Sequence, residues 1–188
     1  AESMVDAVVD RDECNRPDTT LAGLAKLEPV KGPGKFITAG NASQLSDGGA
    51  AVVLMEAKEA ERRGLQPLGA FKGWAVAGCQ PDEMGLGPVF AVPRLLRRHR
   101  LRAQDIDLWE INEAFAAITL ACLRELGLAE DVVNVEGGAI AHGHPIGATG
   151  AVLATRLMHA MQRDRIRRGI VTLCIGGGQG IALALEAV

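Results

Sequence analysis

The chain has 188 residues, 48% of them hydrophobic and 23% charged, which is typical of a globular protein long enough to bury a core. Its formal net charge is −3 with acids and bases interspersed, so no positive field would gather nucleic acid, and no apolar run approaches the ~20 residues of a membrane-spanning helix. The four cysteines form no CxxC pair, so we expect reduced thiols and a cytoplasmic protein.

The first half of the chain predicts few regular elements. Residues 1–47 are rich in turn-forming residues, with one short helical pattern at 20–27. The apolar run AAVVLM at 50–55 predicts a buried strand, and EAKEAERRG at 56–64 predicts a polar helix that ends at its glycine. LGAFKGWAVAG at 68–78 predicts a second strand.

The segment GPVFAVPRLLRRHR at 87–100 predicts a helix. Pro88 suits its first turn, where no N–H is needed, whereas Pro93 is expected to disturb the early part. The helix runs into the basic stretch RRHRLR at 97–102. That stretch is either a solvated helix C-terminus or a patch that contacts the phosphates of a ligand.

A strand and a helix follow directly on each other. DIDLWEI at 105–111 alternates apolar and polar residues, as a strand does. NEAFAAITLACLRELG at 112–127 predicts an amphipathic helix, with Asn112 as its N-cap and Gly127 as its C-terminal stop.

The rest of the chain continues this alternation. VVNV at 132–135 predicts a short strand, and a helix over 149–164 follows a loop rich in glycine and histidine. GIVTLCI at 169–175 and IALALEAV at 181–188 predict two buried strands joined by a GGGQG turn. Strands that alternate with helices indicate an α/β fold in which helices cover both faces of the sheet.

Reactive side chains follow three of the predicted strands. Asn112 follows one, His142 and His144 follow the next, and Cys174 lies near the end of a third. Ligands of α/β folds bind at the carboxyl ends of strands, so these side chains are expected to share one pocket. The glycines around His144 and Cys174 leave backbone N–H groups free to face a ligand.

Each of these residues also has an ordinary explanation. Asn112 is suited to cap a helix, a single histidine is often structural, and a cysteine in an apolar strand packs as a small hydrophobic side chain. His142, His144 and Cys174 are also possible zinc ligands, although their spacing lacks the pairs of structural zinc sites. GHPIGATG has no P-loop lysine, and no GxGxxG dinucleotide motif follows a strand.

Longer motifs in these loops resemble the thiolase family, the coenzyme A-dependent acyltransferases that make or cleave β-ketoacyl-CoA. NEAFA at 112–116, GGAIAHGHPIGATGA at 137–151 and CIGGGQGIA at 174–182 are similar to its three C-terminal signatures, in the family's order. TAGNASQLSDGGAAVVLM at 38–55 is similar to the segment that joins its loop domain to its core. The resemblance implies a layered αβαβα fold, of which this chain supplies mainly the C-terminal half, a mixed sheet covered by helices.

The resemblance also implies roles for individual residues. His144 would deprotonate a nucleophilic cysteine and then hydrogen-bond the thioester oxygen, while Cys174 would act as the acid/base at the α-carbon or the leaving thiolate. Asn112 would hold a water in an oxyanion hole shared with His144, and the backbone N–H of Gly176 would help to bind the other oxyanion. The positions that match the coenzyme A channel and its pantetheine and acyl end are Ser43, Ala39, Arg16, Met84 and Phe115.

By the same comparison the chain divides into three parts. Residues 1–46 would be the tail of the loop domain, 47–67 the closing segment of the N-terminal half, and 68–188 the C-terminal domain. The family's acylated cysteine belongs to the N-terminal half, and none of the other three cysteines lies in its expected surroundings. We therefore expect a fragment of a longer parent or one chain of a two-chain enzyme, inactive alone.

The implied substrates are coenzyme A thioesters, with no permanently bound cofactor and no metal. The implied partners are acetyl-CoA or acyl-CoA, the missing N-terminal half, and further copies in a homodimer or homotetramer, without nucleic acid or membrane. The alternative is a non-catalytic half-subunit that binds coenzyme A or serves assembly. His142 stands where relatives often carry an aliphatic residue, so we expect it beside the reacting groups rather than among them.

Overall fold

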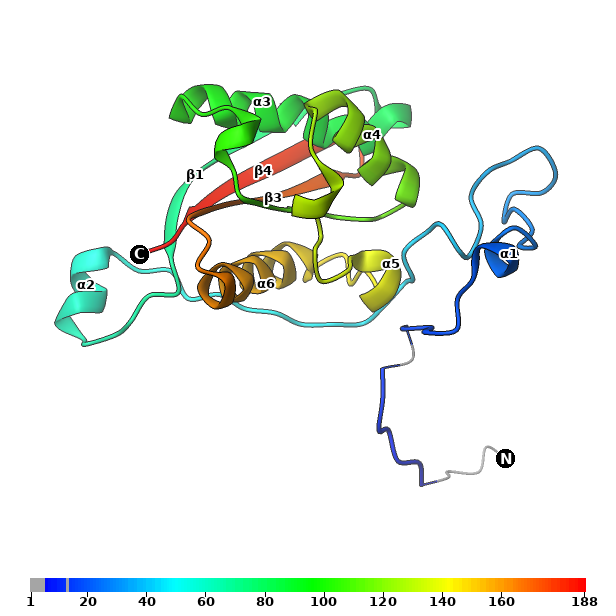
Figure 1. The fold of residues 1–188 in the computed structure, drawn as a ribbon, viewed down its shortest axis with the longest axis horizontal. Helices are drawn as coiled ribbons and strands as arrows, with labels where there is room; N and C mark the ends of the chain where they lie inside the picture. The colour runs from blue at the N-terminus through cyan, green and yellow to red at the C-terminus, as the bar shows by residue number, and fades with distance from the viewer. Residues whose placement is uncertain (1–5, 13) are drawn as a thin grey trace.

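The computed structural model describes residues 6–12 and 14–188, and it contains a four-stranded sheet in the order β1-β4-β3-β2 (Figure 1). β2 and β3 run parallel, whereas β4 is antiparallel to both β1 and β3, so the mixed sheet that the resemblance implied is confirmed. The strands are Ala70–Gly78 (β1), Leu108–Ile111 (β2), Arg168–Ile175 (β3) and Gln179–Glu186 (β4).

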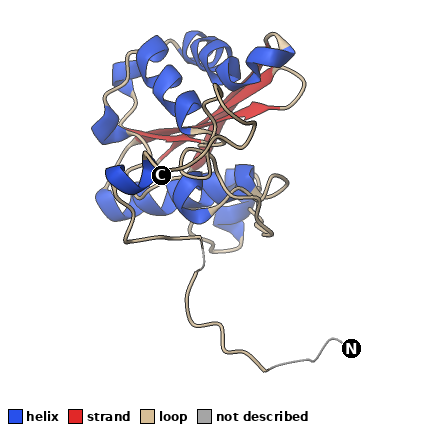
Figure 2. Cartoon of the chain, turned by 90° about the vertical axis from the view of Figure 1, so that its right-hand side faces the viewer, coloured by secondary structure: helices blue, strands red, loops and turns tan. Residues whose placement is uncertain are grey.

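Helices cover both faces of this sheet (Figures 1 and 2). Helices α3 and α4 lie on one face and α6 lies on the other, which gives three layers. Within the described part of the chain, no helix has the length and apolar character to cross a membrane. The helices are α1 (Leu21–Leu24), α2 (Ala57–Arg62), α3 (Gly87–His99), α4 (Ala116–Leu126), α5 (Ala139–His142) and α6 (Thr149–Asp164), with short 3-10 turns η1 (Pro81–Leu86), η2 (Ala103–Asp105) and η3 (Glu130–Val132).

The core consists of one apolar cluster on each face of the sheet. Trp109 packs with α3 and α4, whereas its neighbour Leu108 packs with α6, because successive side chains of a strand point to opposite faces. Burying each large side chain stabilises the fold by roughly 1.5–3 kcal/mol, so β2 is held firmly from both sides. The polar residues that follow β2 therefore start from a rigid support.

Most of the elements expected from the sequence are present. The short helix over 20–27 is α1, where the Thr20 side chain accepts a hydrogen bond of 3.0 Å from Gly23 N–H. Pro88 lies in the first turn of α3, as expected, but the helix also continues through Pro93. The two C-terminal strands form the expected hairpin.

The predicted strand at 50–55 was wrong. The segment forms no strand, and the side chains of Val53 and Leu54 are 84% and 75% exposed. A strand requires a partner for its backbone N–H and C=O groups, and no strand among the described residues pairs with this segment. Its apolar sequence therefore marks a surface and not part of this core.

Two further expectations needed correction. Helix α4 begins at Ala116 with Phe115 in the N-cap position, so Asn112 is not its cap. Asn112 instead prolongs β2, because its N–H donates to the Thr172 carbonyl at 3.0 Å. The predicted strand at 132–135 is reduced to one parallel bridge between Val133 and Trp109.

The proposed division at 46 and 67 falls in stretches without sheet structure, and residues 1–5 and 13 of the 1–46 segment lie outside the described residues. The described part of that segment contacts the layered body near α5 and extends away from it towards the N-terminus (Figure 1). The site is therefore built mainly from loops of the layered body.

Candidate active site

His144 and Asn112 meet at the carboxyl end of β2. Asn112 follows the strand, and His144 lies between α5 and α6. The Asn112 Nδ2 atom lies 3.2 Å from His144 Nε2, and the other ring nitrogen, Nδ1, lies 2.6 Å from Thr149 Oγ1. Both ring nitrogens of His144 therefore have a partner.

These contacts determine the tautomer of His144. The Thr149 hydroxyl donates its hydrogen to the Pro145 carbonyl at 2.9 Å, because a carbonyl oxygen can only accept. Thr149 must then accept from Nδ1–H of the ring, which leaves Nε2 unprotonated and able to accept from the Asn112 amide. Burial lowers the pKa of His144, and nearby His142 lowers it further. His144 thus presents a neutral, basic Nε2 near pH 7.

An extended segment of the N-terminal part joins the two loops. Ala42 bridges to Phe115 beside the Asn112 loop, and Leu45 bridges to His144. The Gln44 carbonyl accepts the backbone N–H of His144 at 3.1 Å. A cavity of about 300 Å³ opens beside this contact and is lined by Leu45, Ser46, Asp47, His144 and Ile146.

Cys174 lies at the same end of the sheet, on the face that α3 and α4 cover. Parallel pairing of β2 with β3 brings the ends of these strands together, and the half-buried Cys174 packs against the cluster under α3 and α4. Burial raises the pKa of the Cys174 thiol, with a smaller contribution from Cys79. No hydrogen bond joins Cys174 to His144 or Asn112 among the residues described, so their convergence stays a prediction.

The GGG turn after Cys174 is shaped by its glycines. Gly177 and Gly178 have φ values of 85° and 87°, in the left-handed region that side chains avoid. A Cβ on Gly178 would also collide with the Cys79 backbone, whose N–H donates to the Gly178 carbonyl at 2.8 Å. Gly176 is exposed in this turn, and nothing in the structure assigns its N–H a role.

The residues matched to the coenzyme A channel fall into two groups. Ser43 and Phe115 lie together, since Ser43 Oγ donates to the Ala114 carbonyl at 3.1 Å, and Ala39 belongs to the turn just before this segment. Arg16 joins them through Gln44, whose side-chain oxygen accepts from the Arg16 guanidinium in the amide orientation that satisfies both groups. Met84 lies apart in η1, which packs against β3, β4 and α4.

A buried acid lies on β2 below the His144–Asn112 pair. Glu110 is 1% exposed, and Arg156 Nε lies 3.7 Å from its Oε2 atom. Neither carboxylate oxygen has a hydrogen-bond partner among the described residues. Burial raises the pKa of Glu110 to about 7, while Arg156 acts in the opposite direction. The sequence suggested only an alternating strand here.

Sequence reasoning also missed Thr149, Glu113 and Asn134, which hold the site in place. Asn134 lies in the VVNV stretch that predicted a strand, and Thr149 was assigned only to a helix start. A buried asparagine in an apolar run was the available signal. Cys14 was likewise not expected near His144, yet a Cβ on the neighbouring Gly143 would stand 3.4 Å from its Sγ atom.

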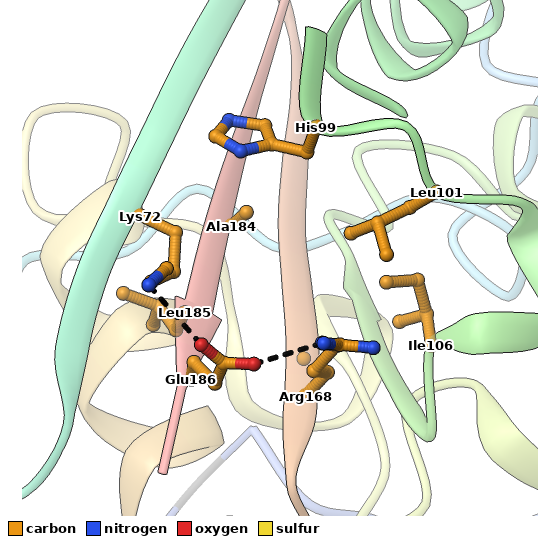
Figure 3. A pocket seen from close by; sticks show the side chains of 9 residues that line it. Lys72, His99, Leu101, Ile106, Arg168, Ala184, Leu185 and Glu186 are labelled. Carbon is orange, nitrogen blue, oxygen red and sulfur yellow. Dashed lines mark hydrogen bonds and ion pairs between the residues drawn. The ribbon is translucent and has the colours of Figure 1, made fainter. Parts of the chain in front are cut away.

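Within the described ranges, His142, His144 and Cys174 are not part of any group of three or more His, Cys, Asp or Glu side chains that could hold a metal ion. A second cavity of about 170 Å³ lies at the opposite end of the sheet (Figure 3). There Lys72 and Arg168 pair with Glu186 at 3.2 Å and 2.9 Å, so the carboxylate already has its ionic partners.

Comparisons with known proteins identify two family models in this chain. The model of the thiolase C-terminal domain matches residues 65–187, and that of the thiolase N-terminal domain matches residues 2–58. Beta-ketoadipyl-CoA thiolase of Pseudomonas aeruginosa is 53% identical over 97% of this chain and 46% of its own length. Acetyl-CoA acetyltransferase of Chromobacterium violaceum is 50% identical over 94% of this chain and 45% of its own length.

Solved structures show the same likeness. Acetyl-CoA acetyltransferase of Bacillus anthracis superposes with a TM-score of 0.91 at 44% identity, over 100% of this chain and 48% of its own. Human mitochondrial 3-ketoacyl-CoA thiolase in complex with CoA gives a TM-score of 0.87 at 38% identity, over 96% and 46%. The chain therefore spans about half the length of the relatives it matches.

Proposed function

The chain belongs to the thiolase family, and we propose that it supplies the acid/base half of a site that transfers acyl groups between coenzyme A thioesters. The His144–Asn112 pair carries the proposal, because it presents an unprotonated imidazole nitrogen beside an amide donor. A base of this kind and a neutral donor are what acyl transfer requires at the thioester.

In this proposal His144 Nε2 takes the proton of a nucleophilic thiol. The ring then carries a hydrogen that donates to the thioester oxygen, with Asn112 holding a water beside it. Cys174 moves a proton at the α-carbon or to the leaving thiolate. Its raised pKa favours the direction in which the thiol donates a proton, because the thiol stays protonated near pH 7. The N–H of Gly176 serves the second oxyanion.

We assign the nucleophilic cysteine to a thiolase N-terminal half that this chain does not contain. Cys122 is unsuited to the role because burial raises its pKa to about 12. The exposed apolar segment at 50–55 is where that half would pair, as the closing segment 47–67 requires. Homodimer or homotetramer formation and a cytoplasmic location remain further parts of this proposal.

Coenzyme A is proposed to lie along the segment that links the two loops. The relative solved in complex with CoA supports coenzyme A as the ligand. The cavity beside Leu45 and His144 supports this place for it. Ser43, Ala39, Arg16 and Phe115 would line the channel, and Met84 would contact the acyl end from η1. No permanent cofactor or metal is part of the proposed chemistry.

The test combines the 188-residue chain with a thiolase N-terminal half and measures cleavage of a 3-ketoacyl-CoA by coenzyme A. We expect activity only from the combination, and its loss in Cys174→Ala but not in His159→Ala, an exposed change on α6. Full activity of the Cys174→Ala combination would instead identify an assembly module without catalytic groups.

A second arm treats the isolated chain with a radiolabelled acyl-CoA. The proposal expects no stable acylation of its thiols. Labelling of Cys14, which lies beside the His144 loop, together with turnover by the pure chain, would show that the chain carries its own nucleophile and would overturn the proposal.

A further inference from the structure

Asn134 acts as a partner for the free edge of β2. This strand is the last of the sheet, and no strand of residues 6–12 or 14–188 pairs with its outer side. Asn134 Oδ1 accepts the N–H of Ile111 at 2.8 Å, and its Nδ2 donates to the carbonyl of the same residue at 2.8 Å. Its backbone N–H donates to the Trp109 carbonyl at 2.9 Å. One residue therefore replaces a stretch of neighbouring strand.

This arrangement requires an unusual backbone. Asn134 has a φ of 47°, which few residues other than glycine adopt readily, although asparagine tolerates it. It is only 9% exposed. The turn at Asn134 explains why the apolar pattern at 132–135 does not continue as a strand.

Glu113 links this turn to the helix that leads to His144. Its Oε1 atom accepts from Asn134 Nδ2 at 2.8 Å, and its Oε2 atom accepts the N–H of Ile140, in α5, at 3.2 Å. A Cβ on Gly138 would collide with the Glu113 carboxylate, so the α5 backbone packs directly on this group. Asn134 and Glu113 together form what we term the 134–113 clamp.

Asn112 lies between Ile111, which Asn134 holds by two hydrogen bonds, and Glu113, which is itself part of the clamp. Its side chain makes only the contact with His144, and its buried Oδ1 atom has no hydrogen-bond partner among the described residues. The direction of the carboxamide therefore depends on the backbone on either side of it. That backbone is fixed by the Thr172 carbonyl and by the clamp.

We infer that Asn134 is a positioning residue of the proposed site, acting through the clamp to aim the Asn112 carboxamide at His144 Nε2. The contribution of Asn134 to catalysis rests on the proposed function. Its positioning of Asn112 does not, because the Asn112–His144 contact can be observed without substrate. Displacements of about 1 Å are enough to reduce catalysis by up to ~100-fold.

The decisive variant is Asn134→Asp, which keeps the size of the side chain and the acceptor for Ile111 N–H. It removes the donor to Ile111 and Glu113 and places two carboxylates together. Loss of the amide hydrogen bond to neutral His144 should raise the pKa of that histidine by up to about one unit, as nitrogen-15 NMR of the 188-residue chain would measure. The nitrogen-15 chemical shifts of exposed His159 at a fixed pH serve as an internal reference and should be the same in the variant and the original chain.

Two further variants separate positioning from simple loss of stability. Leu95→Ala opens a cavity in the core on the other face of the sheet and should destabilise the chain without moving the His144 titration. Glu113→Gln combined with Asn134→Asp reverses the polarity of the link, because the amide introduced at position 113 can donate to the carboxylate introduced at position 134 and still accept from Ile140. This double variant should recover part of the His144 signal.

The clamp would be overturned by folded Asn134→Asp protein whose His144 titrates as in the original chain, or by an equal His144 shift in Leu95→Ala. In the enzyme assembled with the N-terminal half, we expect Asn134→Asp to lower kcat about 10- to 100-fold with little change in KM. A shifted His144 titration with no activity in any assembled form would support the clamp and count against the proposed function.

Discussion

The two ends of the sheet differ in whether their polar side chains have partners. At one end Glu186 forms ion pairs with Lys72, Arg167 and Arg168. Lys72 and Arg168 lower the pKa of this carboxyl group (Figure 3). At the other end Glu110 and Asn112 are almost fully buried, and their side-chain oxygens have no hydrogen-bond partner among the described residues. Satisfied charges stabilise a fold, whereas buried groups with unused hydrogen-bonding capacity are available to a ligand. The second end is therefore where chemistry is expected.

The largest contrast between the two ends should appear in activity. His144→Ala removes the proposed base, so we expect kcat of the assembled enzyme to fall about 10²- to 10⁴-fold. Lys72→Ala, at the other end, should leave kcat within about twofold. Equal losses in the two variants would remove the functional distinction between the ends.

The second contrast concerns stability and pH. The pKa of Glu110 is raised to about 7 from 4.5, so the folded state holds its proton more tightly. The contribution of Glu110 to the free energy of unfolding should then be largest below pH 4.5 and fall by about 3 kcal/mol as pH rises through 7. Urea unfolding of Glu110→Gln should lack this decrease, and an unchanged pH profile would show that Glu110 is not the group responsible.

Thr149→Val tests what orients the His144 ring, at the end of the sheet that carries Glu110 and Asn112. The variant removes the acceptor for His144 Nδ1–H and leaves a buried donor unpaired, which costs about 1–3 kcal/mol. We expect the Nδ1–H tautomer to lose population in nitrogen-15 NMR and kcat to fall about tenfold or more. Thr149→Ser keeps the hydroxyl and should retain both properties; failure of Ser to do so would assign the effect to packing.

The smallest effect on stability is expected at the end of the sheet where Glu186 is paired with cations. Glu186→Gln removes an acid whose lowered pKa stabilises the fold above pH 4.5, and that contribution is lost as pH falls through its folded pKa. Solvent reaches the ion pairs of Glu186, so the free energy of unfolding should change by at most about 1 kcal/mol, and by less at high salt. If Glu186→Gln changed the free energy of unfolding by as much as the pH-dependent contribution predicted for Glu110, measured by the same urea unfolding, the two ends of the sheet would not differ in this respect.

Periodic patterns in the sequence predicted most of the fold. The alternation in β2 and the amphipathic helices at α3, α4 and α6 follow from which residues are apolar, and the glycines at 127 and 177–178 follow from backbone conformations that side chains avoid. The segment at 50–55 misled, because an apolar run shows that a surface needs a partner and not where that partner lies.

The candidate site was only partly predictable. The motifs placed Asn112 and His144 in neighbouring loops, and the Asn112 hydrogen bond to His144 was not implied by any local pattern. Thr149 and Asn134 escaped notice because each forms its hydrogen bonds with residues that are distant or lie in another element. Asn112 was assigned to a helix cap, since its preference for that position is stronger than any local sign of the strand continuing.

The sequence by itself determined the family, the alternation of strands and helices, and which loops carry an imidazole, an amide and a thiol, because these depend on side-chain chemistry and local periodicity. Only the tertiary structure decided which ring nitrogen of His144 is basic, that Asn134 completes the edge of β2, and that Cys174 packs against the cluster under α3 and α4. Those outcomes depend on hydrogen bonds between residues far apart in the chain, and such bonds have geometry only once the layers pack.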